Sequence, residues 1–202
     1  MCQFFETIKC KNGELFNLRW HNSRLNRVRN EYFGESNKID LGKIITIPEN
    51  YKKGLFRCRI VFSKTIDKIE FIPHQFRKIE SLKLIEDNDI DYRFKFYDRK
   101  NLTELFEKRD NCDDILIVKN GCITDSFTAN PIFFDGKKWW TPDTPLLPGT
   151  QRAKLINELK IEVGRITPAN ISKYKKVGLI NVMWNFENMP IIEIDMILIQ
   201  TE

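Results

Sequence analysis

Apolar and polar residues follow two different periods along the chain, and each period predicts a different kind of element. Two short apolar runs, residues 4–10 and 14–17, are separated by Lys11-Asn12-Gly13. Asn-Gly between such runs predicts a β-hairpin, because both central residues of the turn need positive φ. Residues 18–32 then place apolar residues at helical spacing between charged ones, and Gly34 is a typical helix end.

Strand-like alternation continues through the rest of the first half. Residues 55–62 and 66–72 predict two antiparallel strands, and residues 79–85 predict another. The acidic, polar stretch that follows interrupts the pattern and is interpreted as a linker between two lobes. The predicted division is an N-terminal α/β lobe over residues 1–86, a linker over 87–91 and a larger C-terminal lobe over 92–202.

Hairpins dominate the pattern of the second half. Asn120-Gly121 and Asp135-Gly136 each separate two short apolar runs, and so predict two further hairpins. The sum is an α+β fold in two lobes, rich in antiparallel pairs. The remaining predicted elements are helices over 101–109, with Asn101 as the N-cap, and over 151–160, and strands over 177–184 and 191–199.

Composition limits the class of protein. Hydrophobic residues make up 42% of the 202 residues, with 15 Phe and 4 Trp, which is enough for a well-packed core. The net charge of +5 includes no run of five basic residues, so a nucleic-acid partner is not expected. No apolar stretch approaches the roughly 18 residues of a membrane span, and we expect a cytoplasmic protein without a membrane partner.

Cysteine and histidine usage argues against metal chemistry. The chain has five cysteines, none in a CxxC pair, and two histidines. An odd number without paired spacing predicts neither a disulfide framework nor a zinc site, so no metal is expected.

Candidate chemistry lies in two stretches of the second half. Residues 121–130 read GCITDSFTAN, where a strand–turn–strand pattern delivers Asp125 to an irregular stretch that ends at Asn130. Residues 141–152 lead from a proline-rich loop directly into a helix. Lys95 lies thirty positions before Asp125.

These stretches resemble the class IV pyridoxal-phosphate-dependent aminotransferase family of fold type IV, which includes branched-chain and D-amino-acid aminotransferases and aminodeoxychorismate lyases. Residues 121–130 fit the family pattern G-x-[VI]-[TS]-E-x-x-x-x-N, with Asp125 in place of Glu. Residues 141–152 fit its Thr-Pro…Gly…Arg segment, and residues 21–25 fit its H-x-x-R-[LF] motif. Residues 179–183 are similar to a late active-site turn of the lyase branch.

The resemblance implies pyridoxal 5'-phosphate as cofactor and assigns it a set of residues. Lys95 is implied as the amine that binds the cofactor covalently, and its aromatic neighbours provide an apolar setting. Asp125 is implied as the carboxylate beside the pyridine nitrogen. The cofactor-binding set is completed by Arg24 and by Gly149, Thr150 and Gln151 at a helix start, which suit the phosphate, and by Asn130 and Asn181.

Each assignment has a plainer alternative. Lys95 could be one of many surface lysines; its rival Lys83 lies 42 positions before Asp125, too far for the family pattern. Asp125 alone is typical of a turn. Arg57 and Arg59 share one face of a predicted strand. Arg59 is the candidate for binding the substrate carboxylate; the equal alternative is that Arg59 is an ordinary strand residue that faces solvent.

The resemblance is strongest to the aminodeoxychorismate lyase branch, which eliminates pyruvate to give 4-aminobenzoate for folate synthesis. An aminotransferase acting on branched-chain or D-amino acids is the second interpretation, and a non-catalytic relative that kept the fold is the third. The implied partners are a small substrate with an amine and a carboxylate, and a second copy of the chain in a homodimer.

Overall fold

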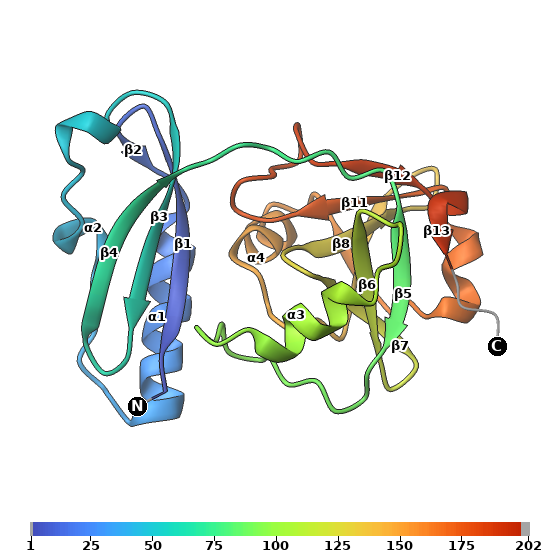
Figure 1. Cartoon of the computed structure of the whole chain (residues 1–202), viewed down its shortest axis with the longest axis horizontal. Coiled ribbons are helices and arrows are strands. Elements are labelled where there is room, and N and C mark those ends of the chain that lie inside the picture. Colours follow the sequence, from blue (N-terminus) through green and yellow to red (C-terminus); the bar gives the residue numbers. More distant parts are fainter. Residues whose placement is uncertain (1, 199–202) are drawn as a thin grey trace. The chain divides into compact units, whose positions relative to one another are not determined.

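The computed structural model describes residues 2–198, and the chain divides into two compact units (Figure 1). The first unit ends at Phe76 and also contains Phe94–Asp98; the second comprises Arg77–Arg93 and the chain from Arg99 onward. The chain therefore passes between the units at three places. This division differs from the predicted one, in which a single linker at residues 87–91 separates the lobes.

A four-stranded antiparallel sheet forms the frame of the first unit, in the order β2-β1-β3-β4. The predicted hairpin is confirmed: Asn12 and Gly13 have φ of 51° and 80° in the turn between the first two strands. The strands are β1 (Phe4–Lys11), β2 (Glu14–Leu15), β3 (Leu55–Phe62) and β4 (Ile66–Pro73).

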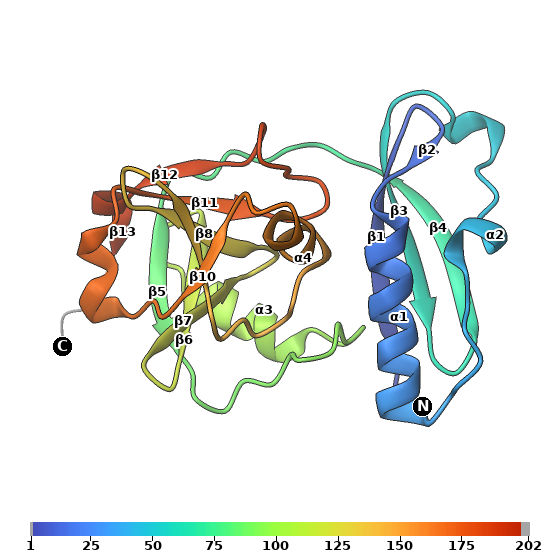
Figure 2. The ribbon, with the colours of Figure 1, turned by 180° about the vertical axis from the view of Figure 1, so that it is seen from behind.

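One helix covers one face of this sheet. Helix α1 (Leu18–Phe33) lies along the sheet (Figure 2) and buries Leu25 and Val28 against the strand residues Phe4, Ile8 and Ile60. It ends at Gly34 as predicted, where φ of 72° places the C-cap in the left-handed region. Two short elements, α2 (Leu41–Ile44) and the 3-10 helix η1 (Glu49–Tyr51), connect α1 to β3.

The second unit contains two sheets. The first has the order β13-β5-β6-β7, in which β5 pairs in parallel with β6, and β6 pairs with β7 through the predicted turn at Asn120-Gly121. Its strands are β5 (Leu82–Glu86), β6 (Asp114–Lys119), β7 (Cys122–Ser126) and β13 (Ile197–Leu198). The strand predicted at 79–85 thus begins later and belongs to this unit, because its hydrogen-bonding partner is β6.

The other sheet has the order β10-β9-β8-β11-β12. Its central hairpin confirms the prediction around Asp135, whose carboxylate accepts hydrogen bonds from Lys137 N, Lys138 N and Trp140 Nε1. The strands are β8 (Asn130–Phe134), β9 (Trp139–Pro142), β10 (Glu162–Gly164), β11 (Lys176–Ile180) and β12 (Ile191–Glu193).

Helix boundaries depart most from the predictions. Helix α3 (Lys100–Glu107) has Arg99 as its N-cap, so the prediction of Asn101 as the cap was wrong. Helix α4 (Thr150–Asn157) ends early, and Leu159 has a positive φ of 55°. The strand predicted over 191–199 is interrupted by the 3-10 helix η3 (Ile194–Met196), and residue 199 lies outside the described residues. A further 3-10 helix, η2 (Pro168–Lys173), precedes β11.

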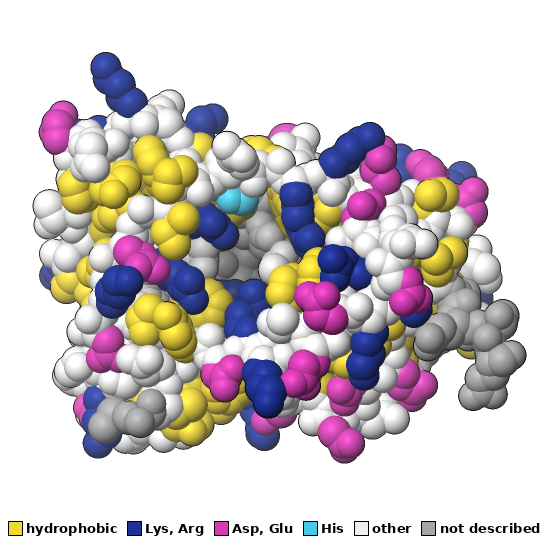
Figure 3. Space-filling model, viewed as in Figure 1, with side chains coloured by type: hydrophobic (Ala, Val, Ile, Leu, Met, Phe, Trp, Pro, Cys, Tyr) yellow, Lys and Arg dark blue, Asp and Glu magenta, His cyan; other side chains and the backbone are white. Residues whose placement is uncertain are grey.

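Charges of both signs are interspersed on the face of the second unit that Figure 3 shows. The net charge of +5 therefore does not form a continuous basic surface on that face. Among residues 2–198, no helix combines the length and the hydropathy needed to cross a membrane.

Candidate active site

Lys95 belongs to the first unit, although it follows a long segment of the second. The stretch Phe94–Asp98 lies beside the open edge of β1, where Phe5 N donates to Lys95 O at 3.0 Å and Tyr97 N donates to Gln3 O at 2.9 Å. These two backbone hydrogen bonds fix the position of Lys95 on the sheet.

The Lys95 and Arg59 side chains contact the same aromatic ring. Lys95 Nζ lies 4.7 Å from the centroid of the Phe5 ring, and Arg59 Cζ lies 4.9 Å from it. The Tyr97 ring lies 5.0 Å from Arg59 Cζ, so two aromatic rings orient this guanidinium group. The candidate covalent lysine and the candidate carboxylate-binding arginine are thus neighbours within one unit.

Arg24 forms a buried ion pair with Glu6 of β1. Arg24 Nε and Nη2 donate to the two Glu6 oxygens at 2.7 and 2.6 Å, and His21 Nδ1 lies 2.7 Å from Glu6 Oε2. Burial opposes ionisation of Glu6, which is 1% exposed, but the Arg24 charge and these hydrogen bonds outweigh it and lower the pKa of Glu6 to about 2.

This pair leaves one nitrogen of Arg24 for another ligand. Within the described residues, Arg24 Nη1 has no hydrogen-bond partner, and Arg24 is 8% exposed. Burial lowers the pKa of His21, so its ring is neutral at neutral pH and Nδ1 donates its proton to Glu6. The cluster therefore carries a fixed, oriented guanidinium group whose charge Glu6 balances.

Asp125 lies on β7 in the second unit, enclosed by hydrogen-bond donors. Its Oδ1 accepts from Asn130 Nδ2 at 3.0 Å and from Leu146 N at 3.1 Å, and its Oδ2 accepts from Leu147 N at 2.9 Å. Burial raises the pKa of Asp125 to about 7, although these donors and the Arg152 charge favour the ionised form. Asp125 is thus a buried strand residue rather than the turn residue of the plainer interpretation.

Asn130 links Asp125 to the loop that precedes α4. It donates from Nδ2 to Asp125 and, at 2.9 Å, to Leu147 O, and so joins β7 to the loop before α4. This loop comes very close to Asn130 at Gly149, where a Cβ atom would lie 2.0 Å from Asn130 Oδ1. Only glycine therefore fits at position 149 without a rearrangement.

Helix α4 starts directly after Gly149. The N–H groups of its first turn have no carbonyl acceptor within the helix, which makes this end a suitable place for an anion. Thr150 and Gln151 are buried. Arg152 anchors the helix, because its Nε donates to Thr141 Oγ1 at 3.1 Å and its Nη2 to Pro142 O at 2.9 Å.

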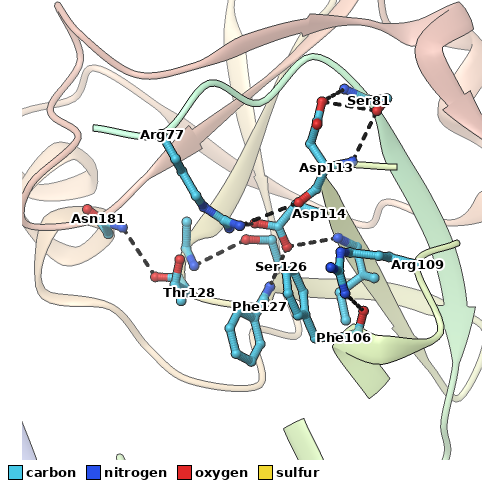
Figure 4. Close-up of polar contacts among 12 residues, drawn as sticks. Arg77, Ser81, Phe106, Arg109, Asp113, Asp114, Ser126, Phe127, Thr128 and Asn181 are labelled. Carbon is cyan, nitrogen blue, oxygen red and sulfur yellow. Dashed lines mark hydrogen bonds and ion pairs between the residues drawn. The ribbon is translucent and has the colours of Figure 1, made fainter. Parts of the chain in front are cut away.

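Hydrogen bonds to Asp114 and from Asn181 hold the turn after Asp125 (Figure 4). Asp114 Oδ1 accepts from Phe127 N at 3.2 Å, and its other oxygen pairs with Arg77. Asn181 Nδ2 donates to Thr128 O at 3.3 Å. Asn181 thus helps to position this turn, and the Thr128 side chain is exposed.

Sequence reasoning missed two of these residues. Glu6 is a carboxylate at an inward-facing position of an apolar strand, and that conflict with the alternation was an available signal. Asp114 has no such signal, because an acid at the start of a strand is common and its partners Arg77 and Phe127 are distant in sequence. No cluster of three metal-ligating side chains occurs in the described part of the chain.

The candidate residues divide between the two units. Arg24, Arg59 and Lys95 belong to the first, and all the others belong to the second: Asp125, Asn130, Gly149, Thr150, Gln151 and Asn181.

A family model described as "Amino-transferase class IV" matches residues 93–194 of the chain. A protein of Haemophilus influenzae described as "Uncharacterized protein" is 38% identical over 185 residues, which are 91% of this chain and 98% of that protein.

Solved structures also align with almost the whole chain. One from Haemophilus somnus, named "putative 4-amino-4-deoxychorismate lyase", is 34% identical, covers 91% of this chain and 97% of its own, and has a TM-score of 0.85. A "putative amino-acid aminotransferase" from Mesorhizobium loti shares the fold at 19% identity, covering 98% of this chain and 100% of its own with a TM-score of 0.82. The fold-type-IV prediction is confirmed.

Proposed function

This chain belongs to the class IV aminotransferase family of pyridoxal-phosphate enzymes, and from that premise we propose that it eliminates pyruvate from 4-amino-4-deoxychorismate to give 4-aminobenzoate. The observation that carries the proposal is the similarity to the Haemophilus somnus protein, at 34% identity over 91% of the chain. The name of that protein specifies a 4-amino-4-deoxychorismate lyase, and we propose the same reaction for this chain.

The pocket around Asp125 supports the binding of a pyridine ring. Its carboxyl group is buried among donors, and burial raises its pKa to about 7 because the donors and the Arg152 charge offset the lost hydration only in part. A protonated pyridine nitrogen brings both an N–H donor and a positive charge, so it suits this carboxylate. We therefore assign Asp125 to the pyridine nitrogen, with Asn130 holding the carboxylate in place.

Two features suit the phosphate group. The start of the eight-residue helix α4, from its N-cap Gly149 through Thr150 and Gln151, suits an anion because backbone N–H groups and the helix dipole point toward it. Arg24 offers the one nitrogen that Glu6 leaves available. Because the pair with Glu6 fixes the guanidinium group, Arg24 needs little reorganisation to bind an anion.

Lys95 is assigned both the covalent bond to the cofactor and the movement of the proton. When bound, the cofactor withdraws electrons from the substrate carbon that bears the amine. With its amine free, Lys95 would act as the base that takes the proton from that carbon. The bond between ring carbon C3 and the ether oxygen then breaks, with its electron pair on oxygen. The ring becomes aromatic, and the released enolate gains a proton at carbon to give pyruvate.

Arg59 is assigned to a substrate carboxylate. Its guanidinium group shares the Phe5 ring with Lys95, so a carboxylate at Arg59 places the substrate amine near Lys95. We also propose that the protein works as a homodimer with small-molecule substrates in the cytoplasm, as the family resemblance implies.

The first test is the visible absorption of the purified protein with added pyridoxal phosphate. The wild-type protein is expected to show a visible band that borohydride removes, and Lys95→Ala is expected to lack it. Lys83→Ala, which removes the other candidate lysine, is the matched control and should keep the band. A band that survives in Lys95→Ala would overturn the assignment of Lys95.

A second assay separates the reactions. Pyruvate and 4-aminobenzoate in equal amounts from aminodeoxychorismate would support the lyase. Keto acid formation from branched-chain or D-amino acids, without pyruvate release from aminodeoxychorismate, would replace it with the aminotransferase interpretation.

A further inference from the structure

The face of the first-unit sheet opposite α1 carries a row of cations. Because directly paired residues of neighbouring strands point to the same face, the register places Lys9 beside Arg57, and Thr7 beside Arg59. Helix α1 packs on the other face, against Ile8, Cys58 and Ile60. The two arginines therefore share a face that α1 does not cover.

Two other basic residues, Lys9 and His74, lie near Arg57. On β4 its paired residue is Ile72, and two residues further on His74 continues the strand by donating its N–H to Leu55 O at 3.1 Å. Burial lowers the pKa of His74, and the charges of Arg57 and Lys9 lower it further. Both Arg57 and Lys9 are thus close enough for their charges to act on the His74 ring.

Buried nitrogen atoms in this cluster lack acceptors. Arg57 Nε and His74 Nε2 are both inaccessible to solvent, and neither has a hydrogen-bond partner within residues 2–198. No ion pair of Arg57 occurs in that part of the chain either. Burying part of a guanidinium group without an acceptor is costly, and an anion bound to the rest of the Arg57 guanidinium group would offset part of that cost.

The surroundings of Arg59 differ from those of Arg57. Its paired residue on β4 is Glu70, a carboxylate that forms its own ion pair with Lys68. Arg59 Nε is also buried without a partner, and its guanidinium group is oriented by Phe5 and Tyr97. The face thus offers two separate guanidinium groups for anions, one near Lys95 and one farther along β3.

We propose that Arg57, together with Lys9 and His74, forms a second anion-binding subsite that holds the second carboxylate of the proposed substrate, while Arg59 holds the first. This inference rests on the proposed function for the place of the amine at Lys95. Residues two apart on a strand are separated by roughly 6.6 Å, a distance that two carboxylates of one small molecule can span. An amino acid with one carboxylate would leave the Arg57 subsite empty.

The test compares two unreactive probes on the pyridoxal-phosphate-loaded protein by titration calorimetry. Benzene-1,3-dicarboxylate is expected to bind at least about 10-fold more tightly than benzoate, since each charged hydrogen bond adds substantially to affinity. Arg57→Gln is expected to remove this preference and leave benzoate binding unchanged. Arg57→Lys, which keeps the charge, should restore part of it.

A matched control removes an arginine from the other side of the unit. Arg27 lies on the exposed side of α1, and Arg27→Gln should keep the preference for the dicarboxylate. Equal affinity of the wild-type protein for the two probes would overturn the inference, as would an unchanged preference in a folded Arg57→Gln protein. The visible cofactor band is a separate readout. If the protein shows no cofactor band but still prefers the dicarboxylate, the proposed reaction is wrong and the anion-binding subsite is supported.

Discussion

The carboxyl group of Asp125 shows how burial and hydrogen bonding compete at one residue. It is 7% exposed and accepts three hydrogen bonds, yet burial still raises its pKa to about 7. The cofactor-free protein therefore holds this group partly protonated at neutral pH. A bound pyridinium group would favour the ionised form and lower the pKa again.

This raised pKa predicts that the protein becomes less stable as pH rises. Between about pH 4 and pH 7 the folded protein keeps a proton on Asp125 that the unfolded chain has released, so the free energy of unfolding decreases as pH rises across that window. The total decrease from this group is ~4 kcal/mol. Asp125→Asn removes it, so urea unfolding at pH 5 and pH 8 should show a smaller decrease in the variant.

Asp135→Asn is the matched control for this measurement. The pKa of Asp135 is lowered to about 2 by backbone N–H groups and by Trp140, so it is ionised at both pH values. Its variant should follow the wild-type pH dependence between pH 5 and pH 8. Identical pH dependence of the wild-type and Asp125→Asn proteins would contradict the assignment of the raised pKa.

At the scale of elements, the start of α4 requires a residue without a side chain at position 149. Gly149 has φ of −67°, which any residue can adopt, so its requirement is for space. A methyl group there would collide with Asn130 Oδ1 at 2.0 Å and displace the residue that holds both Asp125 and Leu147 O. The helix start and the carboxylate are therefore coupled through one amide.

Gly149→Ala should consequently weaken both stability and cofactor binding. Overpacking at such a contact costs about 1–3 kcal/mol of unfolding free energy, and the displaced Asn130 should lower cofactor affinity at least about 10-fold. Urea unfolding and a cofactor titration followed by absorption measure the two effects. Gly42→Ala is the control, since its Cβ would meet Asp40 Oδ1 at an ordinary 3.4 Å. Unchanged cofactor affinity in Gly149→Ala would show that Asn130 adjusts freely.

Hairpins were the elements that the sequence predicted best. Asn12-Gly13 and Asn120-Gly121 both adopt the positive φ values that their turns need. Asn101 was misplaced because capping depends on where the chain enters the helix, and Arg99 occupies that position. The break at Ile194–Met196 was missed because an apolar run predicts a strand equally well with or without a 3-10 turn.

At the scale of the whole molecule, the two units cannot be separated by cutting the chain once. Phe94–Asp98 carries Lys95 back to β1 from within the sequence of the second unit. A fragment that ends at Phe76 would therefore lose Lys95 and the partner of the β1 edge.

The proposed homodimer gives the molecule-scale prediction. Light scattering during gel filtration should give a mass of twice 24.0 kDa, and the mass should not change when the protein is diluted into the micromolar range. Arg27→Gln, a charge removal on the exposed side of α1, should keep the wild-type mass. A single-chain mass at all concentrations would contradict the proposal.

The sequence by itself determined the hairpins, helix α1, the α+β class and the resemblance to the family. These follow from local turn chemistry, side-chain periodicity and motif spacing, which act over a few residues or along one element. Only the tertiary structure decided that β5 pairs with β6, that Lys95 lies beside β1, that Glu6 neutralises Arg24 and that Asp125 is enclosed. Each of these depends on which distant segments meet, because burial and long-range pairing, rather than residue type alone, set the charge and orientation of a side chain.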